Sequence, residues 1–168
     1  MADRVSVLFV CLGNICRSPT AHGVMLKKVE ALGLSGEIQV DSAGTAAYHV
    51  GEKPDARATQ TAAKRGYDLS ALRARQAVAE DFGTFDYVLA MDNENLANLQ
   101  AICPPGSQTQ PQLFLSFARR FRESEVPDPY YGGASGFEHV LDLVEDACDG
   151  LLADIENRQN KQNRSGDA

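Results

Sequence analysis

The sequence predicts a single α/β domain built on a parallel sheet of four strands, with helices on both faces. Short apolar runs alternate with longer segments of helical periodicity, and the first run, residues 5–10, is almost continuously apolar. A strand that is covered on both faces has this composition, whereas a half-exposed strand alternates apolar and polar residues. Alternating strands and helices form a parallel sheet through right-handed crossovers. A chain of 168 residues suits one such domain.

Each strand is expected where an apolar run is bounded by polar or turn-forming residues. After residues 5–10, the expected strands are residues 38–41, residues 86–90 and a weaker fourth at residues 113–115. Ligands of such sheets bind beyond the carboxyl ends of the strands. The sequence therefore predicts a site among the loops that follow residue 10, residue 41 and the fourth strand.

Helices are expected between the strands, where apolar residues recur every three or four positions. The first helix is predicted to have Ser18 as its N-cap, Pro19 as its first residue and Gly33 at its C-terminal end. Two further helices are expected over residues 55–65 and residues 93–102.

The last helix has the clearest pattern, an apolar stripe within residues 137–155. Ser135 and Glu138 have the spacing of a capping box at its start. Residues 157–168 are polar and lack periodicity, so we expect them to fray. The predicted organisation is one domain over residues 1–156 followed by this tail.

The overall composition excludes several classes of protein. The net charge of −7 argues against a long nucleic-acid or anionic-membrane footprint. No apolar run approaches the roughly 18 residues that cross a bilayer, and the N-terminus lacks the features of a signal peptide. We expect a cytoplasmic protein that binds neither nucleic acid nor membrane. A monomer is the expected state, with weak self-association left open.

The four cysteines are expected to be thiols, as in a reducing compartment. Cys11 and Cys16 are close in sequence, but no nearby His or Cys would complete a tetrahedral zinc site with them. No metal and no cofactor are therefore expected. Cys103 and Cys148 are expected to be inert, Cys148 because it lies on the apolar stripe of the last helix.

The loop after the first strand, residues 11–18, has the composition of an anion-binding site with a nucleophile. Gly13 and Asn14 tolerate the left-handed backbone of a tight turn, and Arg17 can bind two oxygens of a phosphate with its planar guanidinium. Cys11 lies where the positive end of a helix dipole favours the thiolate, and the Ser18 hydroxyl could donate to it. The loop thus predicts attack by Cys11 on a bound phosphoryl group.

A cysteine followed six positions later by an arginine is by itself weak evidence, because such pairs arise by chance. The alternative interpretation makes Cys11 a small buried residue and Arg17 a surface residue. The position of the loop favours the functional interpretation. It begins where a buried strand ends and finishes at a capped helix N-terminus, where backbone N–H groups converge on anions.

Residues 7–21 resemble the signature of the low-molecular-weight protein tyrosine phosphatases. Residues 41–45, 90–92 and 126–132 match the family in the expected order. The resemblance extends from about residue 4 to residue 155, and it implies the phosphotyrosine phosphatase I-like fold. It also implies hydrolysis of phosphotyrosine and aryl phosphates without a metal, through a phospho-cysteine intermediate.

The resemblance implies three catalytic residues: Cys11 as the nucleophile, Arg17 as the transition-state clamp and Asp128 as the general acid. Asp-Pro sequences such as Asp128-Pro129 are most often simple turns. The loop that holds them nevertheless follows the fourth strand, on the predicted site edge, and a tyrosyl leaving group requires a proton. The expected partner is a protein substrate that contains phosphotyrosine.

The remaining site residues are implied in three groups. The phosphate-binding loop comprises Leu12, Gly13, Asn14, Ile15, Cys16, Arg17 and Ser18. The hydrogen-bond network that shapes this loop and stabilises the thiolate comprises Asn14, Ser18 and Ser42. The aromatic walls of the pocket are Tyr48 and Tyr130, which would favour a long phosphotyrosine over a short phosphoserine.

Two positions depart from the family pattern. Leu72 stands where the family often has a histidine, so one hydrogen bond to the network is expected to be missing. His22 stands where the family often has a glutamate. Neither position belongs to the nucleophile, the clamp or the acid.

Two further residues allow more than one role. Cys16 is either a packed thiol or the partner that traps an oxidised Cys11 as a disulfide. Asp92 follows a strand and precedes a helix, so capping is its expected role. His49 and His139 have no supporting residues nearby in the sequence.

Two other functions remain open from the residues alone. A thiol-dependent arsenate reductase shares this fold, but its chemistry usually requires a close pair of cysteines in the middle of the chain, and residues 70–100 contain none. A catalytically silent phosphopeptide-binding module is the second alternative. The presence of Cys11, Arg17 and Asp128 together argues against it.

Overall fold

The computed structural model describes residues 4–129 and 134–166, and across them the sheet has four strands. The strand order is β2-β1-β3-β4, and every pair is parallel. The strands are β1 (Val5–Cys11), β2 (Ile38–Gly44), β3 (Tyr87–Ala90) and β4 (Pro111–Leu113). The predicted fold class is confirmed.

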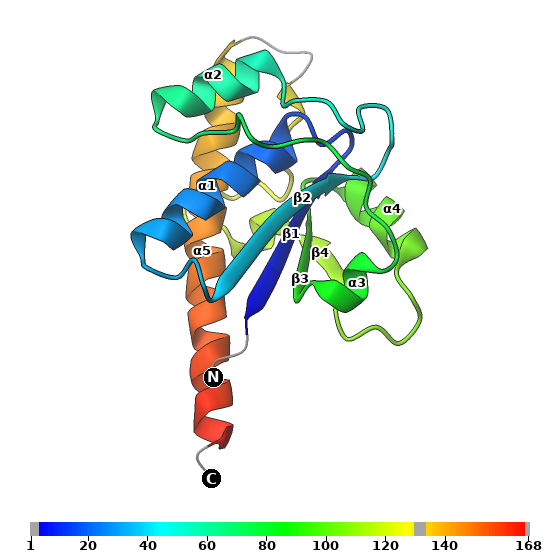
Figure 1. Cartoon of the computed structure of the whole chain (residues 1–168), viewed down its shortest axis with the longest axis vertical. Helices are drawn as coiled ribbons and strands as arrows, with labels where there is room; N and C mark the ends of the chain where they lie inside the picture. The colour runs from blue at the N-terminus through cyan, green and yellow to red at the C-terminus, as the bar shows by residue number, and fades with distance from the viewer. Residues whose placement is uncertain (1–3, 130–133, 167–168) are drawn as a thin grey trace.

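Helices cover both faces of this sheet (Figure 1). One face carries α1 (Arg17–Ala31), α2 (Ala56–Lys64) and α5 (Ala134–Gly166), and the other carries α3 (Asp81–Thr84) and α4 (Asn93–Ile102). The side chains of β1 alternate between the two cores because successive residues of a strand point to opposite faces. Val7 and Phe9 pack with α1 and α5, whereas Leu8 and Val10 pack with α3 and α4.

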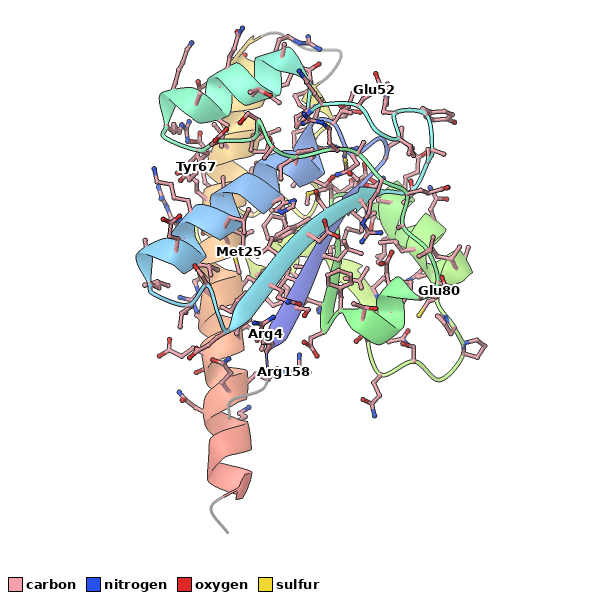
Figure 2. All side chains as sticks on the ribbon, in the orientation of Figure 1. Arg4, Met25, Glu52, Tyr67, Glu80 and Arg158 are labelled. Atoms are coloured by element: carbon pink, nitrogen blue, oxygen red, sulfur yellow. The ribbon has the colours of Figure 1, made fainter. Side chains whose placement is uncertain are left out.

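Side chains fill the space between α1 and the sheet, where Met25 is labelled in Figure 2. All seven residues of β1 are buried, as their apolar composition predicts. Within residues 4–129 and 134–166, no helix combines the length and the apolar composition that a bilayer span requires.

Several element boundaries differ from the predicted ones. The fourth strand ends at Leu113, where the sequence predicted it to begin, and Phe114–Phe117 forms a 3₁₀ helix, η1. Phe114 is fully buried and packs edge-on against Phe9 with ring centroids 5.0 Å apart. This apolar segment therefore belongs to the core as a turn and not as a strand. The short helix α3 was not predicted.

The first helix begins at Arg17, so the prediction of Ser18 as its N-cap is wrong. Cys16 is the N-cap, and Pro19 lies in the first turn, where its missing N–H leaves no helical hydrogen bond unmade. The predicted C-terminal end is confirmed. Gly33 follows the C-cap residue Leu32 and has a left-handed φ of 70°.

The remaining helices match their predicted positions within a few residues, apart from the ends of α5. Ser135 lies inside α5 and not at its N-cap. The helix also continues to Gly166, through the segment predicted as a frayed tail from residue 157. Glu156, Arg158 and Lys161 are strong helix formers, so the packed part of α5 can extend through polar sequence without an apolar stripe.

Candidate active site

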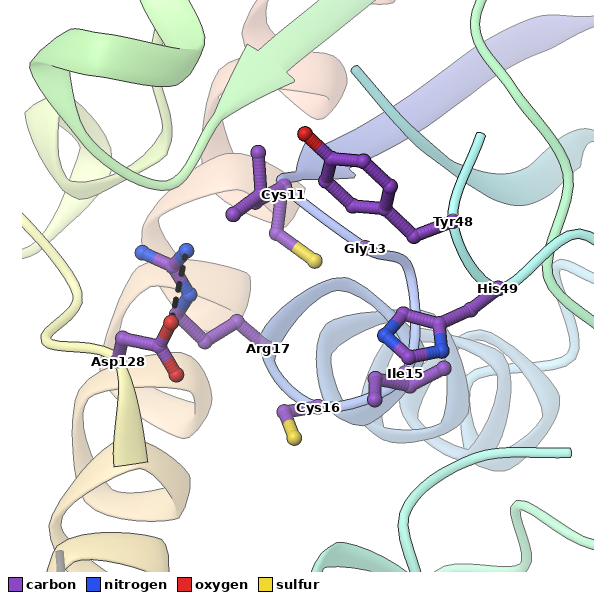
Figure 3. A pocket seen from close by; sticks show the side chains of 9 residues that line it. Cys11, Gly13, Ile15, Cys16, Arg17, Tyr48, His49 and Asp128 are labelled. Carbon is purple, nitrogen blue, oxygen red and sulfur yellow. Dashed lines mark ion pairs between the residues drawn. The ribbon is translucent and has the colours of Figure 1, made fainter. Parts of the chain in front are cut away.

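A pocket of about 220 Å³ lies at the carboxyl end of β1, where the sequence predicted a site (Figure 3). The first strand ends at Cys11, and α1 begins at Arg17. The lining residues come from this loop and from two distant segments: Cys11, Leu12, Gly13, Ile15, Cys16, Arg17, Tyr48, His49 and Asp128.

The Cys11 sulfur lies at the base of the pocket between two hydrogen-bonding groups. The Ser18 hydroxyl oxygen is 3.0 Å from it, and the Asn14 backbone N–H donates to it over 3.3 Å. Asn14 Nδ2 donates to the same Ser18 oxygen over 2.8 Å. Cys11, Asn14 and Ser18 are all buried, so these contacts operate away from bulk water.

The loop has a tight backbone that only certain residue types allow. Asn14 adopts a φ of 58°, the left-handed conformation predicted from its residue type. Gly44, at the end of β2, lies so close to the loop that a Cβ there would be 2.7 Å from the Leu12 carbonyl oxygen. A Cβ on Gly13 would lie 2.9 Å from the His49 ring. The carboxyl end of β2 and the turn that follows it thus pack closely against the loop and restrict its conformation.

Arg17 is buried, lines the same pocket as Cys11 and is held by two further segments. Its Nη1 donates to Asp92 Oδ2 over 2.6 Å and to the Val126 carbonyl over 3.1 Å. Burial opposes its charge, but Cys11, Asp92 and Asp128 outweigh this and raise the pKa of Arg17 above its ordinary value. The guanidinium therefore stays charged where a bound phosphate would lie.

Asp92 has a second role that the sequence analysis missed. Its Oδ1 accepts from the Asn95 backbone N–H over 2.7 Å, which confirms the predicted cap of α4. Its Oδ2 orients Arg17. This role could have been predicted from the position of Asp92 after the carboxyl end of β3, because the carboxyl ends of neighbouring parallel strands lie at one edge of the sheet.

Asp128 lies next to Arg17 in the pocket, and the dashed line in Figure 3 marks their ion pair. Its Oδ2 lies 3.9 Å from Arg17 Nη2, and 37% of its side chain is exposed. Two residues before Asp128, the Val126 N–H donates to the Met91 carbonyl over 2.7 Å, which connects this loop to the end of β3. A carboxyl group is thus placed at the pocket with access to water.

The two predicted aromatic walls have different outcomes. Tyr48 lines the pocket while 78% of it is exposed, so it forms the outer part of one wall. Tyr130 lies outside the described residues. His49, which was not predicted to belong to the site, also lines the pocket, and its Nδ1 lies 2.5 Å from Glu52 Oε2.

Cys16 lies in the wall of the same pocket and is buried. Burial, together with the negative charges of Asp55 and Cys11, raises the pKa of Cys16 to about 12. This thiol is therefore protonated at neutral pH. Cys148 is fully buried in the core, where burial raises its pKa as well.

Ser42 lies near the site, at the end of β2, and its hydroxyl has a polar partner. It lies 2.9 Å from His22 Nδ1, and the backbone of its neighbour Ala43 provides the link to the loop by accepting from Ser18 over 3.3 Å. Leu72 packs against the main core. Of the two departures from the family pattern, His22 thus supplies a polar contact and Leu72 an apolar one.

Comparisons with known proteins agree with this geometry. The model of the low molecular weight phosphotyrosine protein phosphatase family matches residues 6–162. The phosphatase of this name from Schizosaccharomyces pombe is 45% identical over 156 residues, which are 92% of this chain and 99% of that protein. The human protein of the same name is 40% identical over 155 residues, 90% of this chain and 98% of its own.

Solved structures give the same result for the fold. A protein tyrosine phosphatase from Entamoeba histolytica, crystallised with Hepes in the active site, superimposes with a TM-score of 0.88 at 42% identity. The match covers 92% of this chain and 99% of that one. A structure described as Drosophila arginine phosphatase superimposes with a TM-score of 0.81 at 35% identity, over 89% of this chain and 96% of its own.

Proposed function

The chain belongs to the low molecular weight phosphotyrosine protein phosphatase family and is a protein-tyrosine phosphatase, and we propose which of its residues carry the reaction. The observation that supports the assignment is the Cys11 sulfur at the base of the pocket, with the Ser18 hydroxyl and the Asn14 N–H against it and Arg17 beside it. Cys11 is the nucleophile, Arg17 the clamp and Asp128 the general acid.

In the first step the Cys11 thiolate attacks the phosphorus of a bound phosphotyrosine. The S–P bond forms as the bond between phosphorus and the phenolic oxygen breaks, and Asp128 transfers its proton to that oxygen. The position of Asp128 supports this role, because its carboxyl group lines the pocket beside Arg17 and is partly open to water. The products are tyrosine and a phospho-cysteine.

In the second step water replaces the sulfur. The Asp128 carboxylate accepts a proton from the water as its oxygen attacks phosphorus, and the S–P bond breaks to release phosphate and the thiolate. Arg17 and the N–H groups at the start of α1 stabilise the charge on the three equatorial oxygens in both steps. Asp92 supports this by holding Arg17 in place.

The pocket favours a substrate that carries its phosphate on an aromatic ring. Leu12, Ile15 and Tyr48 supply apolar lining between the mouth and the sulfur. A phosphoserine has a shorter reach to the base of such a pocket. Tyr130 is proposed as a second wall on the family resemblance alone.

We further propose that Cys16 protects the nucleophile from irreversible oxidation. A peroxide converts the Cys11 thiolate to a sulfenic acid, and the Cys16 thiol then displaces water to form a disulfide. The proximity of both cysteines in one pocket supports this proposal. Burial keeps Cys16 protonated while Cys11 is reduced, so Cys16 loses its proton as it attacks the sulfenic acid, and that proton leaves with the displaced hydroxide as water.

We propose a cytoplasmic monomer that acts on phosphotyrosine-containing proteins, without nucleic-acid or membrane partners. The four unpaired cysteines support a reducing compartment, and the nucleophile itself requires one. The net charge of −7 supports the absence of an extended binding surface for polyanions. We also propose that the catalytic unit ends within α5, near residue 156.

The test compares three phosphorylated peptides of one sequence, carrying phosphotyrosine, phosphoserine or phosphoarginine, with a metal chelator present. We expect rapid release of phosphate from phosphotyrosine and little from the other two. The phosphoarginine arm matters because the fold is shared with a structure described as an arginine phosphatase. Preferential turnover of phosphoserine, or loss of turnover with the chelator, would contradict the proposal.

A matched pair of variants tests the chemistry itself. Cys11→Ser should abolish turnover and leave phosphate binding, whereas Cys103→Ser, at a half-exposed thiol outside the pocket, should change neither. Rapid quenching of the native enzyme should trap phosphate on the peptide that contains Cys11. Phosphate binding without any turnover in the native protein would indicate a binding module. Thioredoxin-coupled arsenate reduction would indicate a reductase.

A further inference from the structure

The segment over residues 74–77 runs beside the end of β2 and reaches the phosphate-binding loop. The Gly44 N–H donates to the Arg75 carbonyl, and the Ala77 N–H donates to the Gly44 carbonyl, both over 2.8 Å. The Arg75 backbone N–H points the other way and donates to Asn14 Oδ1 over 3.1 Å. This one backbone group connects the segment to the residue that contacts both Ser18 and Cys11.

The side chain of Arg75 anchors this segment to two other elements. Its Nε donates to Asp41 Oδ2 in β2 over 3.0 Å. Its two terminal nitrogens donate to the two oxygens of Asp81 in α3 over 3.2 and 3.1 Å. Such paired contacts hold the planar guanidinium in one orientation. Asp81 is buried and also accepts from the Val78 N–H over 2.8 Å, so the anchor is itself fixed.

The contact at the Asn14 side chain decides the direction of the hydrogen bonds that lead from its amide through Ser18 to the sulfur. A backbone N–H can only donate, so it must face the oxygen of the Asn14 amide. The amide nitrogen is then left to donate to the Ser18 oxygen. Ser18 accepts there and keeps its own proton for Cys11 at 3.0 Å or for the Ala43 carbonyl at 3.3 Å. A thiolate is the stronger acceptor of the two because it is charged.

We propose that Arg75 is a positioning residue: its ion pairs with Asp41 and Asp81 hold its backbone N–H against Asn14, which makes Ser18 a donor to the Cys11 thiolate. This inference rests on the proposed role of Cys11. Arg75 lines no part of the active-site pocket, so it acts only through other residues. The residue lies 64 positions after Cys11 in the sequence and is brought to it by the pairing of its segment with β2.

The test measures the rate at which iodoacetamide alkylates Cys11 as a function of pH, with the Cys11 peptide followed by mass spectrometry. Arg75→Met should move the midpoint upward by about one pH unit, the order expected when a hydrogen bond to a charged group is weakened. Arg65→Met is the matched control. Arg65 is similarly half-buried and pairs with Glu138, Asp142 and Glu145 of α5, away from the loop. This variant should lower the melting temperature and leave the midpoint in place.

Two more variants separate positioning from the charge of Arg75. Arg75→Lys keeps the charge and loses the paired geometry, so it should also raise the midpoint, whereas a direct effect of charge would leave it unchanged. In a Ser18→Ala background, Arg75→Met should cause no further shift because both changes interrupt one chain of contacts. Additive shifts would overturn the proposal.

The outcomes also distinguish this inference from the proposed function. If the native protein shows the midpoint of an ordinary thiol, the role of Cys11 fails. If the native midpoint is low and Arg75→Met leaves it low, only the role of Arg75 fails. Should Arg75→Met not fold, Asp81→Asn removes the charge of the anchor at nearly constant shape and should shift the midpoint in the same direction. An unshifted midpoint in folded Asp81→Asn would likewise overturn the proposal.

Discussion

The two sides of the pocket are built in different ways. On the nucleophile side, Cys11, Asn14 and Ser18 are at most 3% exposed, and their polar atoms contact one another over 2.8 to 3.3 Å. On the acid side, Asp128 has 37% of its side chain exposed and approaches Arg17 only to 3.9 Å. The nucleophile is enclosed by short contacts, whereas the acid lies at the edge of the solvent.

This difference follows from what each group must do. A thiolate is stabilised by donors that are already in place and shielded from water, where each contact is worth more. A general acid must lose and regain a proton in every cycle, which requires contact with water. Variants on the nucleophile side should therefore affect every substrate alike, and variants on the acid side should depend on the leaving group.

The largest effect is expected at Arg17, which belongs to the nucleophile side. Arg17→Lys keeps a positive charge but loses the fork that holds Asp92 and the phosphate, so kcat/KM should fall about 10³-fold for every aryl phosphate. Arg65→Lys provides the control, since Arg65 pairs with acids in the same way far from the pocket. A fall in kcat/KM of less than about tenfold in Arg17→Lys would show that catalysis does not depend on the fixed guanidinium of Arg17.

Asp128 should give a smaller and selective loss. Asp128→Asn cannot donate a proton, so turnover of phenyl phosphate should fall about 10²-fold. Turnover of p-nitrophenyl phosphate should fall much less, because its leaving group is stable without a proton. Glu125→Gln changes an acid beside the same loop and should affect neither substrate. Equal losses for both substrates in Asp128→Asn would remove the distinction between the two sides.

Residues 119–121, in the segment that leads from η1 toward Asp128, are held by Asp146 of α5. The carboxylate of Asp146 accepts from the N–H groups of Arg119, Arg120 and Phe121 over 3.0 to 3.2 Å. Asp146→Ala should lower the free energy of unfolding in urea at pH 7 by about 2 kcal/mol, since three backbone N–H groups lose one buried, charged acceptor. A loss at pH 7 below about 0.5 kcal/mol would contradict this role.

The pH dependence of that loss has a definite sign. Burial opposes the charge of Asp146, but the three N–H groups outweigh it and hold its pKa below the ordinary value of 3.8. Its contribution is therefore present above about pH 4 and is lost as the pH falls through the lower, folded pKa. The native protein and Asp146→Ala should converge in stability as the pH falls from 5 toward 3.

The smallest effect is expected at His22, beneath the nucleophile side. Burial lowers the pKa of His22 below the ordinary 6.5, although Asp41 acts in the opposite direction. The unfolded chain thus binds the proton more readily, so native stability should fall by up to about 1 kcal/mol as the pH drops from 7.5 to 5. His22→Asn keeps a polar atom near Ser42 and should show a shallower decline. Parallel curves for the two proteins would contradict this.

Local features of the fold could be predicted well from the sequence. The first strand, the phosphate-binding loop and the start of α1 lie within one continuous segment, residues 5–19, so their apolar pattern and turn-forming residues report directly on their structure. The left-handed Asn14 and the cap at Asp92 are local in the same sense. The fourth strand was predicted at the wrong residues because a short apolar run such as Phe114-Leu115 can be buried either in a strand or in a 3₁₀ helix.

Contacts between distant residues could not be predicted in this way. Arg17 meets Asp92 at a separation of 75 residues and the Val126 carbonyl at 109, and Arg75 meets Asn14 at 61. No periodicity in the sequence encodes such pairs. The resemblance to a family implied a network that included Ser42, but in this chain its hydroxyl contacts His22.

The sequence alone determined the class of fold and the position of the loop that holds the proposed nucleophile, because each depends on residues that are neighbours along the chain. Tertiary structure decided what surrounds them. The order β2-β1-β3-β4 places the end of β1 between the ends of β2 and β3. Segments that follow those two strands then supply the groups that orient Arg17 and Asn14, and only the folded chain brings these groups within hydrogen-bonding distance.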